Sequence, residues 1–158
     1  MIDVDVAGAV EVEVEVATGL ADAHLVGIGV DAVDVERFRR LLARRPNFSE
    51  RFFSATERAD AGLAPDPTES LAARFAAKEA VMKALGSGLG SFALNEVEVR
   101  RTEGTDATRN NPYLVLHGAA AALADRQHAG PLHLSLSHTG SVAIAFVVAE
   151  RATPCAQS

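Results

Sequence analysis

Apolar residues form short runs, or alternate with polar residues, at several places along the chain, and these places predict β-strands. The run Leu-Val-Gly-Ile-Gly-Val over 25–30 has the composition of a buried strand that ends at Asp31. Its two glycines indicate that another backbone or a ligand approaches this strand closely. The same patterns predict further strands over 92–101, 113–117, 132–138 and 141–149.

Valine and glutamate alternate strictly over 10–16. This period fits an edge strand with one buried face and one acidic, exposed face. The low complexity and the terminal position equally fit a loose arm. Residues 1–24 are therefore interpreted as an acidic arm, either an extra strand or disordered, whose last part over 19–24 is a linker.

Helical periodicity is clearest over 68–85, a stretch that runs into the glycine-rich loop 86–90. Asp66 offers a capping carboxylate, Pro67 occupies the first helical position, and Glu69 follows the cap by three residues. Gly86 supplies the stop signal. At about 100° per residue, one apolar stripe is predicted to contain Leu71, Phe75, Met82 and Leu85.

Three other helices are expected around this central one. The first follows Asp31, which has the right position to cap it, and ends before Pro46. A second is expected over 48–64, and an alanine-rich third over 118–128. The element order β-α-α-α-β-β-α-β-β predicts one α+β domain over 25–150 with its helices on one face of a sheet, followed by a C-terminal tail over 151–158. The inner face of the first helix is predicted to contain Val35, Phe38, Leu41 and Leu42.

Composition narrows the class of protein. The 158 residues are 48% hydrophobic and 23% charged, as in an ordinary soluble globular domain with a sizeable core. The sequence contains no run of the ~20 apolar residues that a membrane span needs, and the acidic N-terminus does not resemble a secretory signal. The single cysteine, Cys155, excludes an internal disulfide and a cysteine zinc site. We therefore expect a cytoplasmic protein without a membrane partner.

Charge is distributed unevenly along the chain. Residues 1–24 carry six acidic groups and no lysine or arginine, which accounts for the whole net charge of −6. An arginine-rich segment follows over 37–58 and indicates an anionic partner. A nucleic acid is disfavoured as that partner, because the body is neutral, tryptophan is absent and aromatic content is only 5%. The arginines of this segment are Arg37, Arg39, Arg40, Arg44, Arg45, Arg51 and Arg58.

Four side chains at predicted strand ends or on the central helix are candidates for chemistry: Asp31, Glu79, Lys83 and His138. Two carboxylates from different elements, without cysteine or an HExxH motif, suit Mg²⁺ rather than zinc. A lysine and a glycine loop beside them suit a di- or polyphosphate substrate. The residues alone leave plainer interpretations open, because Glu79 and Lys83 have the spacing of a surface ion pair and the loop has the composition of a flexible helix exit.

Three segments occur in a distinctive order. Gly-Ile-Gly-Val-Asp over 27–31 precedes Glu-Arg-Phe over 36–38; Arg-Phe-Ala-Ala-Lys-Glu-Ala-Val-Met-Lys-Ala-Leu-Gly spans 74–86; Leu-Ser-Leu-Ser-His-Thr spans 134–139. Together they resemble the holo-acyl-carrier-protein synthases, the AcpS-type group of the 4′-phosphopantetheinyl transferases. The resemblance implies that group's fold, a small antiparallel sheet with helices packed on one face, assembled as a homotrimer with sites between neighbouring subunits.

The resemblance also implies an activity, the transfer of the 4′-phosphopantetheine arm of coenzyme A to a serine of an apo carrier protein, with release of adenosine 3′,5′-bisphosphate. Asp31 and Glu79 would bind Mg²⁺ against the pyrophosphate, and Lys83 would neutralise or protonate the leaving phosphate oxygen. Either Glu79 or a metal-bound water would accept the serine proton. The residues implied in coenzyme A binding are Arg74, Lys78, Gly86, Gly88, Ser137, His138 and Thr139.

Carrier proteins of this class are acidic, so the arginine-rich segment gains a function in steering and docking one. The acidic arm has no counterpart in compact members of the family, and we expect it to lie over the arginine face and tune carrier choice. The alternative function is a carrier-binding module that has lost catalysis, and the choice between a fatty-acid and a polyketide carrier is left open. The residues expected to contact the carrier are Arg37, Leu41, Arg44, Phe48 and Arg51.

Overall fold

The computed structural model describes residues 24–88, 90–102 and 111–153, and the statements below concern these residues. The expected strand over 10–16 and most of the C-terminal tail lie outside them. The strands are β1 (Leu25–Asp34), β2 (Val97–Arg101), β3 (Pro112–Leu116), β4 (Ala129–His138) and β5 (Val142–Arg151). The helices are α1 (Val35–Arg44), α2 (Phe48–Phe52), α3 (Ala55–Gly62), α4 (Pro67–Ala84), the 3₁₀ turn η1 (Leu94–Glu96) and α5 (Gly118–Arg126).

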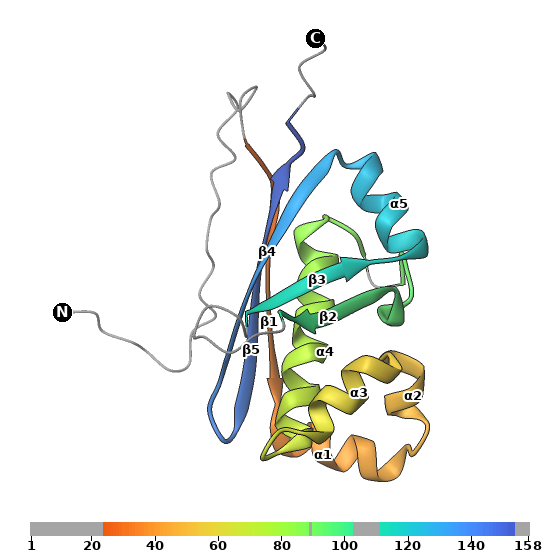
Figure 1. The fold of residues 1–158 in the computed structure, drawn as a ribbon, viewed down its shortest axis with the longest axis vertical. Helices are drawn as coiled ribbons and strands as arrows, with labels where there is room; N and C mark the ends of the chain where they lie inside the picture. The colour runs from red at the N-terminus through yellow and green to blue at the C-terminus, as the bar shows by residue number, and fades with distance from the viewer. Residues whose placement is uncertain (1–23, 89, 103–110, 154–158) are drawn as a thin grey trace, which may run out of the picture.

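Two antiparallel sheets and a central helix form the architecture. The larger sheet has the strand order β1-β5-β4, and β2 pairs with β3 in a separate ribbon. All the helices lie on one side of the larger sheet, and α4 runs along its inner face (Figure 1). The predicted α+β class with helices on one face is therefore confirmed.

Helix α4 is enclosed on nearly every side, which the single predicted apolar stripe did not anticipate. The larger sheet covers one flank, while α1, α3 and β2 pack on the others. A helix with apolar residues all round is typical of such a central position. Its alanines make this close packing possible, and those that are buried are Ala72, Ala73, Ala76, Ala77, Ala80 and Ala84.

The two glycines of β1 bring this strand into contact with α4, as the sequence predicted. A Cβ atom at Gly27 would overlap the carbonyl oxygen of Ala84, and one at Gly29 would overlap that of Ala80. Only hydrogen fits at both positions. Strand and helix backbones therefore meet directly at this point.

The ends of the helices follow their capping signals. Asp66 accepts hydrogen bonds from the backbone N–H groups of Thr68 and Glu69 at the start of α4. At its end, Gly86 adopts a φ of 60°, and the bonds Gly86 N–H to Lys83 O and Ser87 N–H to Met82 O form a Schellman motif. The predicted start and stop of the central helix are confirmed.

Several predicted boundaries were wrong. Strand β1 continues past Asp31 to Asp34, because Asp34 supplies the cap of α1 by accepting from Arg37 N–H. The expected helix over 48–64 is divided into α2 and α3, since Ser54 starts α3 with a reciprocal capping box to Glu57. Strand β2 starts at Val97, because residues 94–96 form a 3₁₀ turn, and β4 and β5 each extend further than expected.

The outer face of the larger sheet is apolar and open to solvent in the single chain. Ile28 is 53% exposed, Val30 47%, Ile144 42% and Phe146 41%. These side chains lie on neighbouring strands, because Val30 pairs with Phe146 across β1 and β5. A contiguous apolar face of this kind marks an interaction surface.

Candidate active site

Asp31 lies in the middle of β1 and its side chain faces α4. Alternate strand residues point to the same side, so Asp31 shares the inner face of the two glycines that touch the helix. Its Oδ1 accepts a hydrogen bond of 2.9 Å from Lys83 Nζ, which also donates to the carbonyl oxygen of Val30 at 2.8 Å. The Lys83 side chain is 53% exposed, so its ammonium group stays accessible to an anion.

Glu79 lies one turn before Lys83 on α4, near the same carboxylate. Burial raises the pKa of Glu79 above its usual value, the charge of Asp31 raises it further, and Lys83 opposes both effects. Within the described ranges the Glu79 carboxylate accepts no hydrogen bond, and Lys83 pairs with Asp31 instead. The plain interpretation of Glu79 and Lys83 as a surface ion pair is therefore wrong.

The arrangement of Asp31 and Glu79 fits a divalent cation. Two neighbouring carboxylates disfavour each other's ionisation, and a cation held by both would remove that repulsion. In the part of the chain that the structure describes, no cluster of three or more histidine, cysteine or acidic side chains could hold a metal. Two carboxylates with the other positions open suit Mg²⁺, which usually retains waters and phosphate oxygens.

The glycine loop turns away directly after Lys83. Gly86 has the left-handed conformation that ends α4, and the Ser87 hydroxyl donates to the Met82 carbonyl oxygen at 3.1 Å. Gly88 is exposed, and its carbonyl oxygen accepts from the Ser91 hydroxyl at 2.8 Å. Hydrogen bonds thus hold the described loop residues 86–88, and Gly90 lines the cavity beside Glu79.

Glu79 also lines a cavity of about 350 Å³. Sequence reasoning missed most of its lining, because these residues come from three segments that only the fold brings together. Five apolar side chains with no shared periodicity form much of its wall, and no sequence signal groups them. The lining residues are Arg51, Phe52, Glu79, Met82, Gly90, Phe92, Ala93, Leu94 and Asn95.

The end of β4 does not join this site within one chain. His138 Nδ1 lies 2.7 Å from Glu69 Oε1, near the N-terminus of α4. Ten residues of helix separate Glu69 from Glu79, a distance of roughly 15 Å along the axis at 1.5 Å per residue. Ser137 and Thr139 are exposed beside His138. The structure thus brings Asp31, Glu79 and Lys83 together and leaves Ser137, His138 and Thr139 apart from them.

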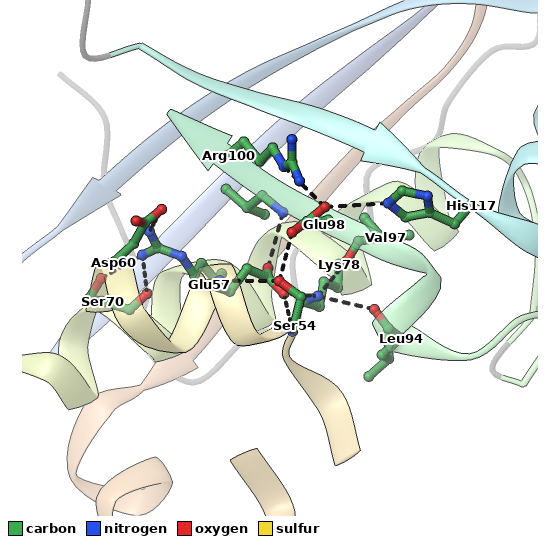
Figure 2. A network of polar contacts seen from close by, with 12 residues as sticks. Ser54, Glu57, Asp60, Ser70, Lys78, Leu94, Val97, Glu98, Arg100 and His117 are labelled. Carbon is green, nitrogen blue, oxygen red and sulfur yellow. Dashed lines mark hydrogen bonds and ion pairs between the residues drawn. The ribbon is translucent and has the colours of Figure 1, made fainter. Parts of the chain in front are cut away.

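Lys78 points into the interior rather than toward a substrate. Its ammonium group donates to Glu57 Oε2 at 2.9 Å, to Leu94 O at 3.1 Å and to Val97 O (Figure 2). The side chains of Lys78 and Glu57 have no exposed surface. The expected contact of Lys78 with coenzyme A is therefore not supported, because its ammonium group forms a buried ion pair with Glu57.

Arg74 also turns inward, which does not support its expected contact with coenzyme A. Its guanidinium donates to the hydroxyl of Ser70 at 2.5 Å and lies 3.7 Å from the carboxylate of Asp60. The side chain is only 2% exposed, and this burial lowers the pKa of Arg74. Arg74 and Lys78 share the side of α4 that faces α3, whereas Glu79 and Lys83 face outward.

The predicted carrier-binding residues all belong to α1 and α2. Arg37, Arg44 and Arg51 are exposed, while Leu41 and Phe48 are half-buried among them. Phe48 belongs to an aromatic cluster in which its ring lies 4.4 Å from that of Phe52, 5.8 Å from Phe38 and 5.8 Å from Phe75. Arg51 also lines the cavity beside Glu79, so one of these five residues borders the candidate site.

Comparison with known proteins identifies the family of the chain. The family model of the 4′-phosphopantetheinyl transferase superfamily matches residues 27–147. Among curated relatives, the holo-[acyl-carrier-protein] synthase of Frankia casuarinae is 50% identical over 126 residues, which are 80% of this chain and 98% of that protein. The synthase of Salinispora arenicola is 46% identical over 127 residues, 80% of this chain and 99% of that one.

Solved structures give the same result. The holo-(acyl-carrier-protein) synthase of Bacillus anthracis, determined in complex with CoA (3′,5′-ADP), superposes with a TM-score of 0.64 at 35% identity. The match covers 82% of this chain and 100% of that one. Sequence motifs, fold and site agree on one assignment. The chain belongs to the 4′-phosphopantetheinyl transferase superfamily, as a member of its holo-[acyl-carrier-protein] synthase group.

Proposed function

We propose that this enzyme transfers the 4′-phosphopantetheine group of coenzyme A to a serine of an apo acyl carrier protein and releases adenosine 3′,5′-bisphosphate. The observation that carries the proposal is the meeting of Asp31 on β1 with Glu79 and Lys83 on α4. This site suits a pyrophosphate. The relatives named for the same activity support the choice of substrate.

In this reaction the serine oxygen attacks the phosphorus that bears the pantetheine arm, and the bond from that phosphorus to the adenosine bisphosphate oxygen breaks. Mg²⁺, held by Asp31 and Glu79, would neutralise the pyrophosphate charge. Lys83 stabilises or protonates the leaving oxygen, because its ammonium group is exposed beside the two acids. The serine proton passes to Glu79 or to water next to it. Phosphoryl-type transfer needs such positioning and charge neutralisation more than a covalent catalyst.

The carrier protein docks on the arginine surface formed by Arg37, Leu41, Arg44, Phe48 and Arg51. Its exposed guanidinium groups attract an acidic partner, and the half-buried side chains give the contact an apolar centre. Arg51 brings the docked serine toward Glu79, because Arg51 borders both the surface and the cavity. The acidic arm over 1–24 competes for this surface, so its deletion should change the KM for the carrier protein and the salt dependence of that KM.

The active assembly is a homotrimer, with each site completed by a neighbouring copy. Two observations support this. The outer sheet face with Ile28, Val30, Ile144 and Phe146 is apolar and exposed. His138 and its neighbours lie far from Glu79 in their own chain, so a second copy would have to bring Ser137, His138 and Thr139 to the coenzyme A. We place the reaction in the cytoplasm because it consumes coenzyme A.

Incubation with coenzyme A, Mg²⁺ and an apo carrier protein, followed by mass spectrometry of the carrier, tests the activity. Wild-type enzyme should add one phosphopantetheine mass, and omission of Mg²⁺ should prevent the addition. Asp31→Ala and Glu79→Ala should each abolish the mass gain with an unchanged circular dichroism spectrum. Asp125→Ala, which removes an exposed acid on α5, is the matched control and should retain activity. Carrier binding without any mass gain by wild type would favour the inactive binding module.

A further inference from the structure

Three separate segments enclose the cavity beside Glu79. Helix α2 contributes Arg51 and Phe52, the segment over 90–95 contributes the opposite wall, and α4 contributes Glu79 and Met82. The segments come from distant parts of the sequence, so the width of the cavity depends on what fixes them to one another.

The Lys78 side chain lies close to all three segments. Lys78 belongs to α4 and directly precedes Glu79. Its ammonium group donates to the carbonyl oxygen of Leu94, in the segment over 90–95. It also lies 5.4 Å from the ring centroid of Phe53, the residue after Phe52 at the end of α2. Its remaining donors bind Glu57 and the carbonyl oxygen of Val97 (Figure 2), so all three N–H bonds are used.

Glu57 extends this connection to the backbone on both sides. Its Oε2 accepts from Ser54 N–H at 2.9 Å, two residues after Phe52, and its Oε1 accepts from Val99 N–H at 3.0 Å in β2. The Ser54 hydroxyl then donates to Glu98 Oε1 at 2.7 Å. Each wall of the cavity is therefore bound, within a few residues of its lining, to a polar network built on the fully buried pair of Glu57 and Lys78.

A charged pair is a costly means of holding a core together. Removing two charges from water carries a large penalty, and well-packed apolar residues are often at least as stabilising. What an ion pair adds is direction, because each donor and acceptor must find its partner at a fixed distance.

We propose that Glu57 and Lys78 are positioning residues that fix the walls of the cavity against Glu79 and thereby place coenzyme A for the reaction. Neither residue touches the substrate. The inference rests on the proposed function, since it names residues that support that same site.

The test uses the full chain and the double variant Glu57→Gln/Lys78→Met, which removes both charges together and leaves no unpaired buried ion. KM is measured well below the melting transition, where circular dichroism shows that more than about 95% of the molecules are folded. Under these conditions KM describes the folded enzyme. The KM for coenzyme A should rise and kcat/KM should fall by about tenfold or more, because small displacements of reacting groups have large effects. A merely structural role would lower the active fraction and leave KM unchanged.

Ala124→Gly is the matched control, because Ala124 is a buried residue of α5 outside the cavity lining. It should lower the melting temperature without changing KM. Wild-type KM in the folded double variant would overturn the proposal, as would an equal change in the control. If the double variant does not fold, Ser54→Ala replaces it, with an expected rise in KM of at least about threefold; an unchanged KM there also overturns the proposal.

Hydrogen–deuterium exchange provides a readout that does not depend on activity. The variant should exchange faster than wild type in peptides covering 48–53 and 90–97, while the control should not. If the variant exchanges faster but the wild-type enzyme is inactive, the proposed function is rejected, while the role of Glu57 and Lys78 in fixing the cavity walls is retained. Unchanged exchange in both peptides would show that Glu57 and Lys78 do not fix the cavity walls, whatever the wild-type activity.

Discussion

Replacement of Gly29 by alanine tests the contact on which the active site is built. An added Cβ would overlap the carbonyl oxygen of Ala80, which is backbone and cannot rotate away. Alanine normally gains about 0.5–1 kcal/mol over glycine in a strand, through the entropy of the unfolded chain. Overpacking of a core costs about 1–3 kcal/mol, and the upper end applies here because a helix and a strand must separate. We therefore expect a net loss of about 2 kcal/mol.

For a chain of this length, each kcal/mol corresponds to about 2–4 °C in the melting temperature. Thermal unfolding by circular dichroism should therefore show a decrease of about 4–8 °C. Transfer activity should fall in the molecules that remain folded, because Asp31 lies two residues further along β1 and would move away from Lys83. Gly62→Ala is the control, since a Cβ there meets no atom within 4 Å. An unchanged melting temperature and full activity for Gly29→Ala would refute the reasoning.

Three further predictions concern the site and the assembly. Lys83→Met should lower kcat by about 10²–10³-fold without unfolding the chain, because the side chain is largely exposed and acts on developing charge; steady-state rates retaining more than one tenth of wild type would contradict its role. The pKa of Glu79 is raised by burial and by Asp31, so the folded state binds a proton more tightly than the unfolded state. Stability should therefore decline as pH rises from the usual glutamate pKa through the folded-state pKa. Glu79→Gln should thus be more stable than wild type at pH 7, with a smaller difference at pH 4, in urea unfolding without divalent cations; an equal difference at both pH values would show that Glu79 is not the cause. Phe146→Lys places a charge on the apolar outer face and should shift the sedimentation coefficient toward that of a monomer; an unaltered assembly would mean that the subunits associate elsewhere.

The sequence was sufficient to predict that Asp31, Glu79 and Lys83 meet, because local signals place each of them. The cap and the glycine stop predict the helix that carries Glu79 and Lys83. The glycines of β1 predict the close contact that brings Asp31 to that helix. The end of β1 was misplaced, because Asp31 and Asp34 are equally good caps in sequence, and only the strand pairing through Val142 selects Asp34.

The inward side chains could not be predicted in the same way. Arg74 and Lys78 carry charges that normally indicate an exposed face, and their burial depends on acids far away in sequence. Glu57 lies 21 residues before Lys78, and neither position has a local pattern that links them. Similarly, His138 was grouped with Glu79 because both belong to the segments that carry the family resemblance, whereas distance within one chain separates them.

The glycine pair in β1 also protects the fold against misalignment. Successive strand residues face opposite sides, so a slip of one residue would turn the carboxylate of Asp31 outward and push Val30 against the helix. Valine has no room beneath the carbonyl oxygens of Ala80 and Ala84, where only glycine fits. Gly27 and Gly29 thus exclude shifted pairings of β1 by steric overlap with α4. The same contact directs the side chain of Asp31 toward Lys83 as the chain folds.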